Sequence, residues 1–209
     1  MKLYDFARAP SPRRVRIFLA EKNVTLPMVQ VDLRKGEQQE DWFLRLNPWA
    51  TVPVLELDDG TAISEASACC RYLEEIYPDP PLLGRTAAEK GVIAMWDHRC
   101  EIDGFLAVAE AFRNETPGMK DRALPGVPSF PQIPVLAERG RLRVVHFMQL
   151  LDQRLAGSEY LAGDVFTVAD ITALISIDFA GWLKITIPPE RPHLARWHGL
   201  VSARPSAGA

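Results

Sequence analysis

The chain has 209 residues, of which 24 are Lys or Arg and 27 are Asp or Glu, so its formal net charge is −3. This near balance, without any Lys/Arg cluster, argues against a nucleic-acid partner, which requires a concentrated basic face. No stretch approaches the roughly 18 apolar residues of a membrane span. Asp5 and Arg8 also interrupt the N-terminus before an apolar signal region could form. We therefore expect a cytoplasmic protein with no nucleic-acid and no membrane partner.

The first 77 residues predict alternating strands and helices. Residues 2–6 form a short apolar strand, and a helix at about 12–22 begins at Pro12 with Ser11 as its N-cap. The other elements follow in chain order: a strand at 26–33, a short helix at 40–46, strands at 52–57 and 61–63, and a helix from Ser64 that ends before Pro78. The order βαβαββα predicts a small α/β domain.

The pattern changes after the Pro-Asp-Pro-Pro sequence at 78–81, which no helix can cross. Thr86 and Glu89 have the spacing of a capping box, and a long helical pattern follows them. Two further helices are predicted at 142–155 and from Thr167 onward, while prolines at every third position from 125 to 134 indicate an extended loop. We expect a first domain at 1–78, a linker at 79–85 and an all-helical domain at 86–209.

Several familiar cofactor motifs are absent. The chain has no glycine-rich nucleotide loop, and its four histidines show no ligand spacing with cysteines or carboxylates, so neither a metal nor a nucleotide cofactor is expected. The three cysteines, Cys69, Cys70 and Cys100, form no C-x-x-C motif and are interpreted as reduced structural thiols.

Three short segments combine polar groups with a turn or a helix start at the same end of the predicted sheet. At 10–12, a hydroxyl lies at the positive end of a helix, where it can hold a thiolate. At 51–54, a Val-Pro bond that we expect to be cis turns backbone groups outward for an extended peptide. At 64–67, a helix start offers N–H groups to a carboxylate and an acid to an ammonium group. Each segment alone also fits an ordinary cap or turn, but together they suit a small peptide that carries a thiol.

The sequence resembles the cytosolic glutathione S-transferase family from residue 2 to about 206. The resemblance is carried by motifs at 3–6, 14–22, 47–55, 63–65 with 71–73, 161–171, and Trp197 with 201–206. It implies a thioredoxin-like N-terminal domain, an all-helical C-terminal domain, glutathione as co-substrate and a homodimer. The chain is most similar to the bacterial theta-, nu- and zeta-like groups.

The resemblance also implies which residue activates the sulfur of glutathione. Ser11 is the candidate because it is the only hydroxyl or thiol between Tyr4 and Thr25. Its register matches the active Cys of beta-like enzymes, whereas in delta- and zeta-like sequences the active Ser falls nearer Ala9. Tyr4 lies in the strand, a few residues before the position that Tyr-type enzymes use.

The glutathione-binding residues are likewise implied by the resemblance. Gln38 falls where some members bind the glycine carboxylate, with a solvated loop residue as the alternative. Glu65 takes the position of the usual Glu-Ser pair, but Ala66 replaces the serine, so that one hydroxyl is lost while Ser67 is adjacent. The residues expected to present backbone to the cysteinyl unit are Thr51, Val52 and Pro53.

The leading functional hypothesis is a glutathione transferase that joins glutathione to a small electrophile. One alternative is a glutathione-binding or interaction protein with little turnover, which the loss of a hydroxyl at Ala66 makes reasonable. The other is a glutathione-dependent thiol reductase, which should carry a Cys at the first helix start, whereas the earliest cysteine is Cys69.

Overall fold

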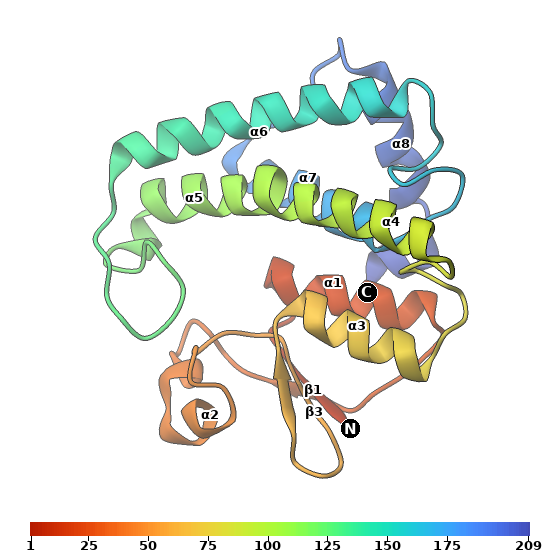
Figure 1. Cartoon of the computed structure of the whole chain (residues 1–209). Coiled ribbons are helices and arrows are strands. Elements are labelled where there is room, and N and C mark those ends of the chain that lie inside the picture. Colours follow the sequence, from red (N-terminus) through yellow and green to blue (C-terminus); the bar gives the residue numbers. More distant parts are fainter. The chain divides into compact units, whose positions relative to one another are not determined.

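The computed structural model describes residues 1–209 and divides them into two compact units (Figure 1). The first unit comprises Met1–Pro80, Leu124–Ser129 and Ala209, and the second comprises Pro81–Ala123 and Phe130–Gly208. The functional domains expected at 1–78 and 86–209 stay a prediction. None of the helices is both long enough and apolar enough to cross a membrane.

The first unit contains a four-stranded sheet in the order β2-β1-β3-β4. The strands are β1 (Lys2–Asp5), β2 (Met28–Gln30), β3 (Val54–Glu56) and β4 (Ala62–Ser64). β1 pairs parallel to β2, and the other two pairings are antiparallel. β2 is shorter than the strand predicted at 26–33 because it lies at the sheet edge, where its only partner, β1, has four residues. The sheet and its helices confirm the thioredoxin-like fold.

Helices α1 (Pro10–Glu21) and α3 (Ala66–Ile76) lie side by side (Figure 1). Lys22, just after α1, forms a buried ion pair with Glu74 of α3 and donates a 2.5 Å hydrogen bond to the Pro80 carbonyl. The short helices η1 (Glu37–Gln39) and α2 (Asp41–Leu46) follow β2. Phe43 of α2 packs in one apolar cluster with Tyr4 and Val54 of the sheet.

The second unit is entirely helical, as predicted. Its helices are α4 (Ala87–Arg99), α5 (Leu106–Glu115), α6 (Pro134–Leu155), α7 (Val168–Ala180) and α8 (Pro192–Ser202), with the short 3-10 turns η3 (Pro117–Met119), η4 (Gly181–Leu183) and η5 (Pro205–Gly208). α7 is the central helix, because nearly every one of its residues is buried. α5 and α6 pack closely: a Cβ atom on Gly140 would lie 2.7 Å from the backbone nitrogen of Ala111.

Between α4 and α5 the chain forms a π-helix, η2 (Cys100–Phe105). The wider turn interrupts the usual hydrogen-bond ladder, and neighbouring helices bond to two of its carbonyls. Arg143 Nη2 of α6 donates to the Ile102 carbonyl at 2.6 Å, and Ser176 Oγ of α7 donates to the Cys100 carbonyl at 3.5 Å. The sequence pattern predicted an uninterrupted helix here, which is wrong at this turn.

The capping box predicted at Thr86 with Glu89 is present, and a second box, of Thr167 with Asp170, forms where a helix was predicted to begin. The proline-rich stretch is mostly loop, as expected, but Pro134 is the first residue of α6 rather than part of that loop. A proline is compatible with this position because the N–H it lacks would have no partner inside the helix.

Candidate active site

The start of α1 differs from the prediction. Ser11 was expected to be the N-cap, but the helix begins at Pro10 and its N-cap is Ala9, which makes no side-chain cap. The fixed φ of proline suits the first helical position, and Pro10 takes this position, so the helix begins two residues earlier than predicted. Ser11 therefore lies in the first turn, partly buried, and its Oγ accepts a hydrogen bond from Arg14 Nη2 at 3.1 Å.

The prolines on both sides of Ser11 restrict what this helix start can donate. Pro10 and Pro12 have no backbone N–H, so Ser11 and Arg13 supply the only N–H groups of the first four helical residues. The positive end of the helix dipole favours an anion here. The hydroxyl and the backbone N–H of Ser11 are thus neighbouring donors at the positive end of a helix.

The loop before β3 has the predicted cis bond between Val52 and Pro53. Asn47, which is buried, holds this loop: its Nδ2 donates to the Thr51 carbonyl at 2.8 Å and to Thr51 Oγ1 at 3.1 Å. The last β1–β3 pair is Tyr4 with Val54, so the backbone of Val52 lies beyond the ladder. Neither its N–H nor its carbonyl has a partner within the chain. This arrangement can pair with an extended peptide.

The start of α3 carries a residue in an uncommon backbone conformation. Glu65 is the N-cap, with φ +71°, a region that residues other than glycine seldom occupy. Its exposed carboxylate makes no hydrogen bond or ion pair within the chain. Ala66 is 1% exposed at the first helical position, and the partly buried Ser67 follows it. A free carboxylate thus lies next to N–H groups at the positive end of a helix.

Gln38 of η1 is buried, so the alternative of a solvated loop residue is wrong. The chain reaches it through Gly36, which has φ +81°. The Oε1 atom of Gln38 is buried without a hydrogen-bond partner. Because nearly all buried polar atoms in proteins are hydrogen-bonded, this oxygen calls for an external donor.

The strand register brings these segments to one end of the sheet, where β1 and β4 end and β3 begins. Tyr4 pairs with Val54, and Val54 pairs with Ser64, so the end of β1, the start of β3 and the end of β4 form one row. The segments leading to Ser11, Val52 and Glu65 all leave from that row. Asp5 also pairs with Gln30, which places the end of β2, before Gln38, at the same end of the sheet. The predicted convergence of the segments is confirmed by this pairing.

Tyr4 is not available for this site. Its hydroxyl donates to Glu56 Oε2 at 2.7 Å, and its ring packs against Trp42 and Phe43 of α2. Burial raises the pKa of Tyr4, and the hydrogen bond to Glu56 raises it further. Ser11 thus has no competing hydroxyl from β1.

The cysteines do not supply a reactive thiol either. Cys69, Cys70 and Cys100 are all buried, and none of them forms a disulfide. Burial raises the pKa of Cys69 to about 12, so its thiol is protonated at neutral pH. Burial also raises the pKa of Cys100 well above its usual range. These thiols have the structural role that was predicted, and they do not favour a thiol reductase.

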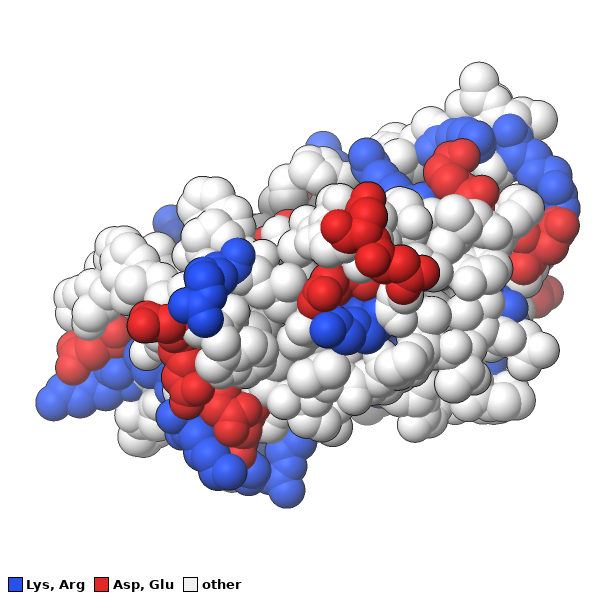
Figure 2. Space-filling view, turned by 90° about the horizontal axis from the view of Figure 1, so that it is seen from below, with Lys and Arg blue, Asp and Glu red and all other residues white.

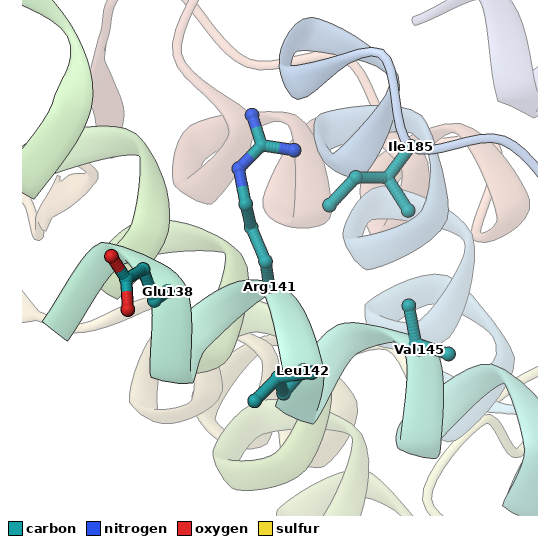
Figure 3. A pocket seen from close by; sticks show the side chains of 5 residues that line it. All are labelled: Glu138, Arg141, Leu142, Val145 and Ile185. Carbon is teal, nitrogen blue, oxygen red and sulfur yellow. The ribbon is translucent and has the colours of Figure 1, made fainter. Parts of the chain in front are cut away.

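A separate surface pocket of about 450 Å³ lies on the second unit (Figure 3). Figure 3 shows Glu138, Arg141, Leu142 and Val145 along α6, with Ile185 across from them. None of the predicted site residues lines this pocket. Arg141 already forms a two-pronged ion pair with Glu115, with its Nε and Nη2 at 2.8 and 2.6 Å from the carboxylate oxygens, so the pocket presents no uncommitted cation.

The face of the molecule in Figure 2 carries Lys and Arg side chains interspersed with Asp and Glu. No broad patch of one sign is visible on this face. No group of three or more His, Cys, Asp or Glu side chains is placed to hold a metal ion.

Sequence reasoning gave no role to two residues that organise this site, Asn47 and Arg14. Asn47 precedes a proline, a pair that often begins a turn, and this signal could have indicated its role in the loop. Arg14 follows Ser11 by three positions, which places both on one helix face, but nothing in the sequence marks Arg14 as buried.

The fold defines the chain as a protein with a thioredoxin-like unit and a helical unit. Residues 9–76 match the family described as the N-terminal domain of glutathione S-transferase, and residues 96–205 match its C-terminal domain. The chain belongs to the glutathione S-transferase family. Its relatives include glutathione S-transferase 2 of Saccharomyces cerevisiae, which is 39% identical over 99% of this chain and 87% of the relative.

Solved structures agree with this assignment. A glutathione S-transferase domain-containing protein from Marinobacter aquaeolei is 41% identical, with a TM-score of 0.92 over 99% of both chains. A class Gtt2 glutathione S-transferase from Vibrio parahaemolyticus is 38% identical, with a TM-score of 0.84 over 99% of this chain and 94% of that one. The similarity therefore extends over both units and includes Gtt2-type enzymes.

Proposed function

We propose that this protein is a glutathione transferase that ionises the thiol of glutathione and joins it to a small electrophile. One observation carries the proposal. Ser11, Val52 and Glu65 lie at the same end of the sheet and present groups suited to different parts of one thiol peptide. The full-length similarity to glutathione S-transferases supports the same reaction.

The residues of the first unit fit glutathione part by part. The unpaired backbone of Val52, between Thr51 and Pro53, pairs with the cysteinyl unit as an added strand. The carboxylate of Glu65 binds the γ-glutamyl ammonium group, and the N–H groups of Ala66 and Ser67 bind its carboxylate. Gln38 binds the glycine end, where its amide has both a donor and an acceptor.

Ser11 stabilises the thiolate by donating a hydrogen bond to sulfur. A free thiol has a pKa of about 8.5, and lowering it by two units requires about 2.7 kcal/mol. A hydrogen bond to a charged partner contributes roughly 1.5–3 kcal/mol and the helix dipole up to about 1 kcal/mol. The thiol proton leaves to solvent, and the thiolate forms a C–S bond with the electrophile. In a substitution the leaving group departs with its electron pair. In an addition the π-bond of the electrophile breaks, and the atom that receives its electron pair takes up a proton from solvent.

Two assays on the purified protein test this function. Retention on immobilised glutathione reports binding, and conjugation of glutathione to an aryl halide and to an isothiocyanate reports catalysis. We expect both. Retention without conjugation of either substrate would instead indicate a binding protein, and the absence of both would contradict the glutathione site.

We further propose a cytoplasmic homodimer. Three buried cysteines without disulfides fit a reducing compartment. The exposed side of α3 carries Arg71, Glu75 and the half-exposed Ile76, and α4 exposes Val92 and Met95, a mixture that suits a symmetric interface. Light scattering at micromolar concentration should give close to twice the chain mass of 23.4 kDa. A mass of one chain with full activity would contradict the dimer.

A further inference from the structure

The contact between Arg14 and Ser11 fixes which way the Ser11 hydroxyl can donate. Arg14 lies one turn after Ser11 on the same face of α1, and its Nη2 is 3.1 Å from Ser11 Oγ. A guanidinium group has only donors and stays charged at every physiological pH, so in this contact Ser11 must accept. The single hydroxyl proton of Ser11 is therefore not used by Arg14 and remains for another acceptor.

Arg14 is also held in place, unlike most arginines. It is 4% exposed, although arginine is almost never fully buried unless it has partners. Its charge reaches the start of α3 as well. Cys69, in the first turns of α3, has a pKa that burial raises most, that the negative charge of Glu65 raises further, and that the positive charge of Arg14 lowers. The Arg14 charge thus acts on Cys69 of α3 as well as on Ser11.

We propose that Arg14 is a positioning residue that orients and polarises the Ser11 hydroxyl, so that hydrogen bonds run from Arg14 to Ser11 to the thiolate of glutathione. The inference rests on the proposed role of Ser11. Donation from a cation withdraws electron density from the Ser11 oxygen and strengthens the hydrogen bond that its O–H donates onward. Arg14 itself does not touch sulfur, and no proton is transferred along this chain.

The thiol pKa of bound glutathione is the readout that separates this role from a structural one. It is measured from the thiolate absorbance of the glutathione complex across pH. Arg14→Met, which is close in length and uncharged, should raise this pKa by about one unit, equivalent to tenfold less thiolate at pH values below it. Arg14→Lys keeps the charge but loses the planar donor group, and it should give a smaller rise.

Combining each Arg14 variant with Ser11→Ala tests whether Arg14 acts through Ser11. In the Ser11→Ala background the effect of Arg14→Met should fall below about a third of its size in the parent, since interacting residues are not additive. The control is Arg8→Met, which removes a charge of the same sign from the exposed loop before α1 and should leave the thiol pKa unchanged.

Three outcomes would overturn the inference. The first is a folded Arg14→Met protein whose thiol pKa equals that of the parent. The second is an equal pKa shift in both backgrounds, which would show that Arg14 acts independently of Ser11. If Arg14→Met does not fold, the same two comparisons of the thiol pKa are made with Arg14→Lys, in the parent and in the Ser11→Ala background. The third is an unchanged thiol pKa in Ser11→Ala alone, which removes the proposed role of Ser11 itself and so separates that failure from a failure specific to Arg14.

Discussion

The starts of α1 and α7 differ in whether a side chain caps the backbone N–H groups of the first helical turn. At α7, Thr167 and Asp170 form a buried capping box, and the Asp170 carboxylate accepts hydrogen bonds from Leu161 N, Thr167 N and Trp197 Nε1 at 2.9–3.0 Å. At α1, the N-cap is Ala9, which provides no side-chain cap, and the first turn contains Pro10 and Pro12.

The difference separates a helix start that stabilises the fold from one that we propose faces a ligand. Every donor around Asp170 is satisfied inside the protein, so nothing is left for a partner. At α1 the donors of Ser11 are not used by a cap, and at α3 the N-cap Glu65 has a positive φ and no side-chain cap. Local rules of helix capping are broken where the site lies, as is typical of functional sites.

The largest effect is expected at the satisfied helix start. Asp170→Ala would leave several buried donors without an acceptor, which should lower the free energy of unfolding by about 3–5 kcal/mol. Urea unfolding followed by circular dichroism measures this loss. Asp164→Ala, at an exposed residue of the same segment, is the control and should stay within about 0.5 kcal/mol of the parent. A loss below about 1 kcal/mol at Asp170 would show that the box is not essential to the unit.

Ser11→Ala should have the reverse profile. We expect kcat/KM to fall ten- to a thousandfold, roughly 1.4–4 kcal/mol of lost thiolate stabilisation. Ser11 is not the N-cap, but its loss removes the acceptor of buried Arg14 Nη2, so the free energy of unfolding should fall by about 1 kcal/mol, less than for Asp170→Ala. Steady-state kinetics and urea unfolding of the same preparation test both statements. Near-normal turnover would show that a backbone N–H, and not the Ser11 hydroxyl, stabilises the thiolate.

Glu65→Gln tests the other open helix start. Glutathione binding should weaken by about 1–3 kcal/mol, because an ammonium group would lose its charged partner. Titration calorimetry measures the affinity directly, with Glu75→Gln, at an exposed position of the same helix, as the control. An unchanged affinity would mean that Glu65 serves the helix start alone.

Thr86→Ala gives the smallest expected effect and sharpens the comparison. Thr86 caps α4 with Glu89, but this box is exposed, unlike the one at α7. Its loss should lower the free energy of unfolding by about 1 kcal/mol and leave glutathione affinity unchanged. A loss as large as that of Asp170→Ala would show that burial does not distinguish the two boxes.

The order of elements and both capping boxes could be predicted from the sequence because they follow from local chemistry. Hydrophobic spacing identified the helices, and Thr-x-x-Glu and Thr-x-x-Asp identified two of their starts. Strand lengths could not be predicted in the same way, since β2 ends where its partner β1 ends rather than where its apolar residues do.

The site was harder to predict in detail. Pro10 and Pro12 are both compatible with a first helical position, so the sequence could not decide whether Ala9 or Ser11 is the N-cap. The burial of Gln38 and Arg14 depends on neighbours distant along the chain, and polar side chains of these types are usually exposed. A resemblance to a known family located the segments, whereas their hydrogen-bond partners required the three-dimensional structure.

The π-helix η2 has a consequence for how this chain can change by insertion or deletion. A π-turn corresponds to one additional residue in an α-helix, so deleting one residue between Cys100 and Phe105 would leave a continuous helix from α4 to α5. Because the wider π-turn already absorbs the extra residue, the residues of α5 would keep nearly the same direction about the helix axis. Ala107 and Ala111, whose backbones lie against Gly140, would therefore still face α6. A deletion in this turn would affect the carbonyls that accept from Arg143 and Ser176, whereas a deletion inside α4 or α5 would rotate every residue between it and the α5–α6 contact by about 100°.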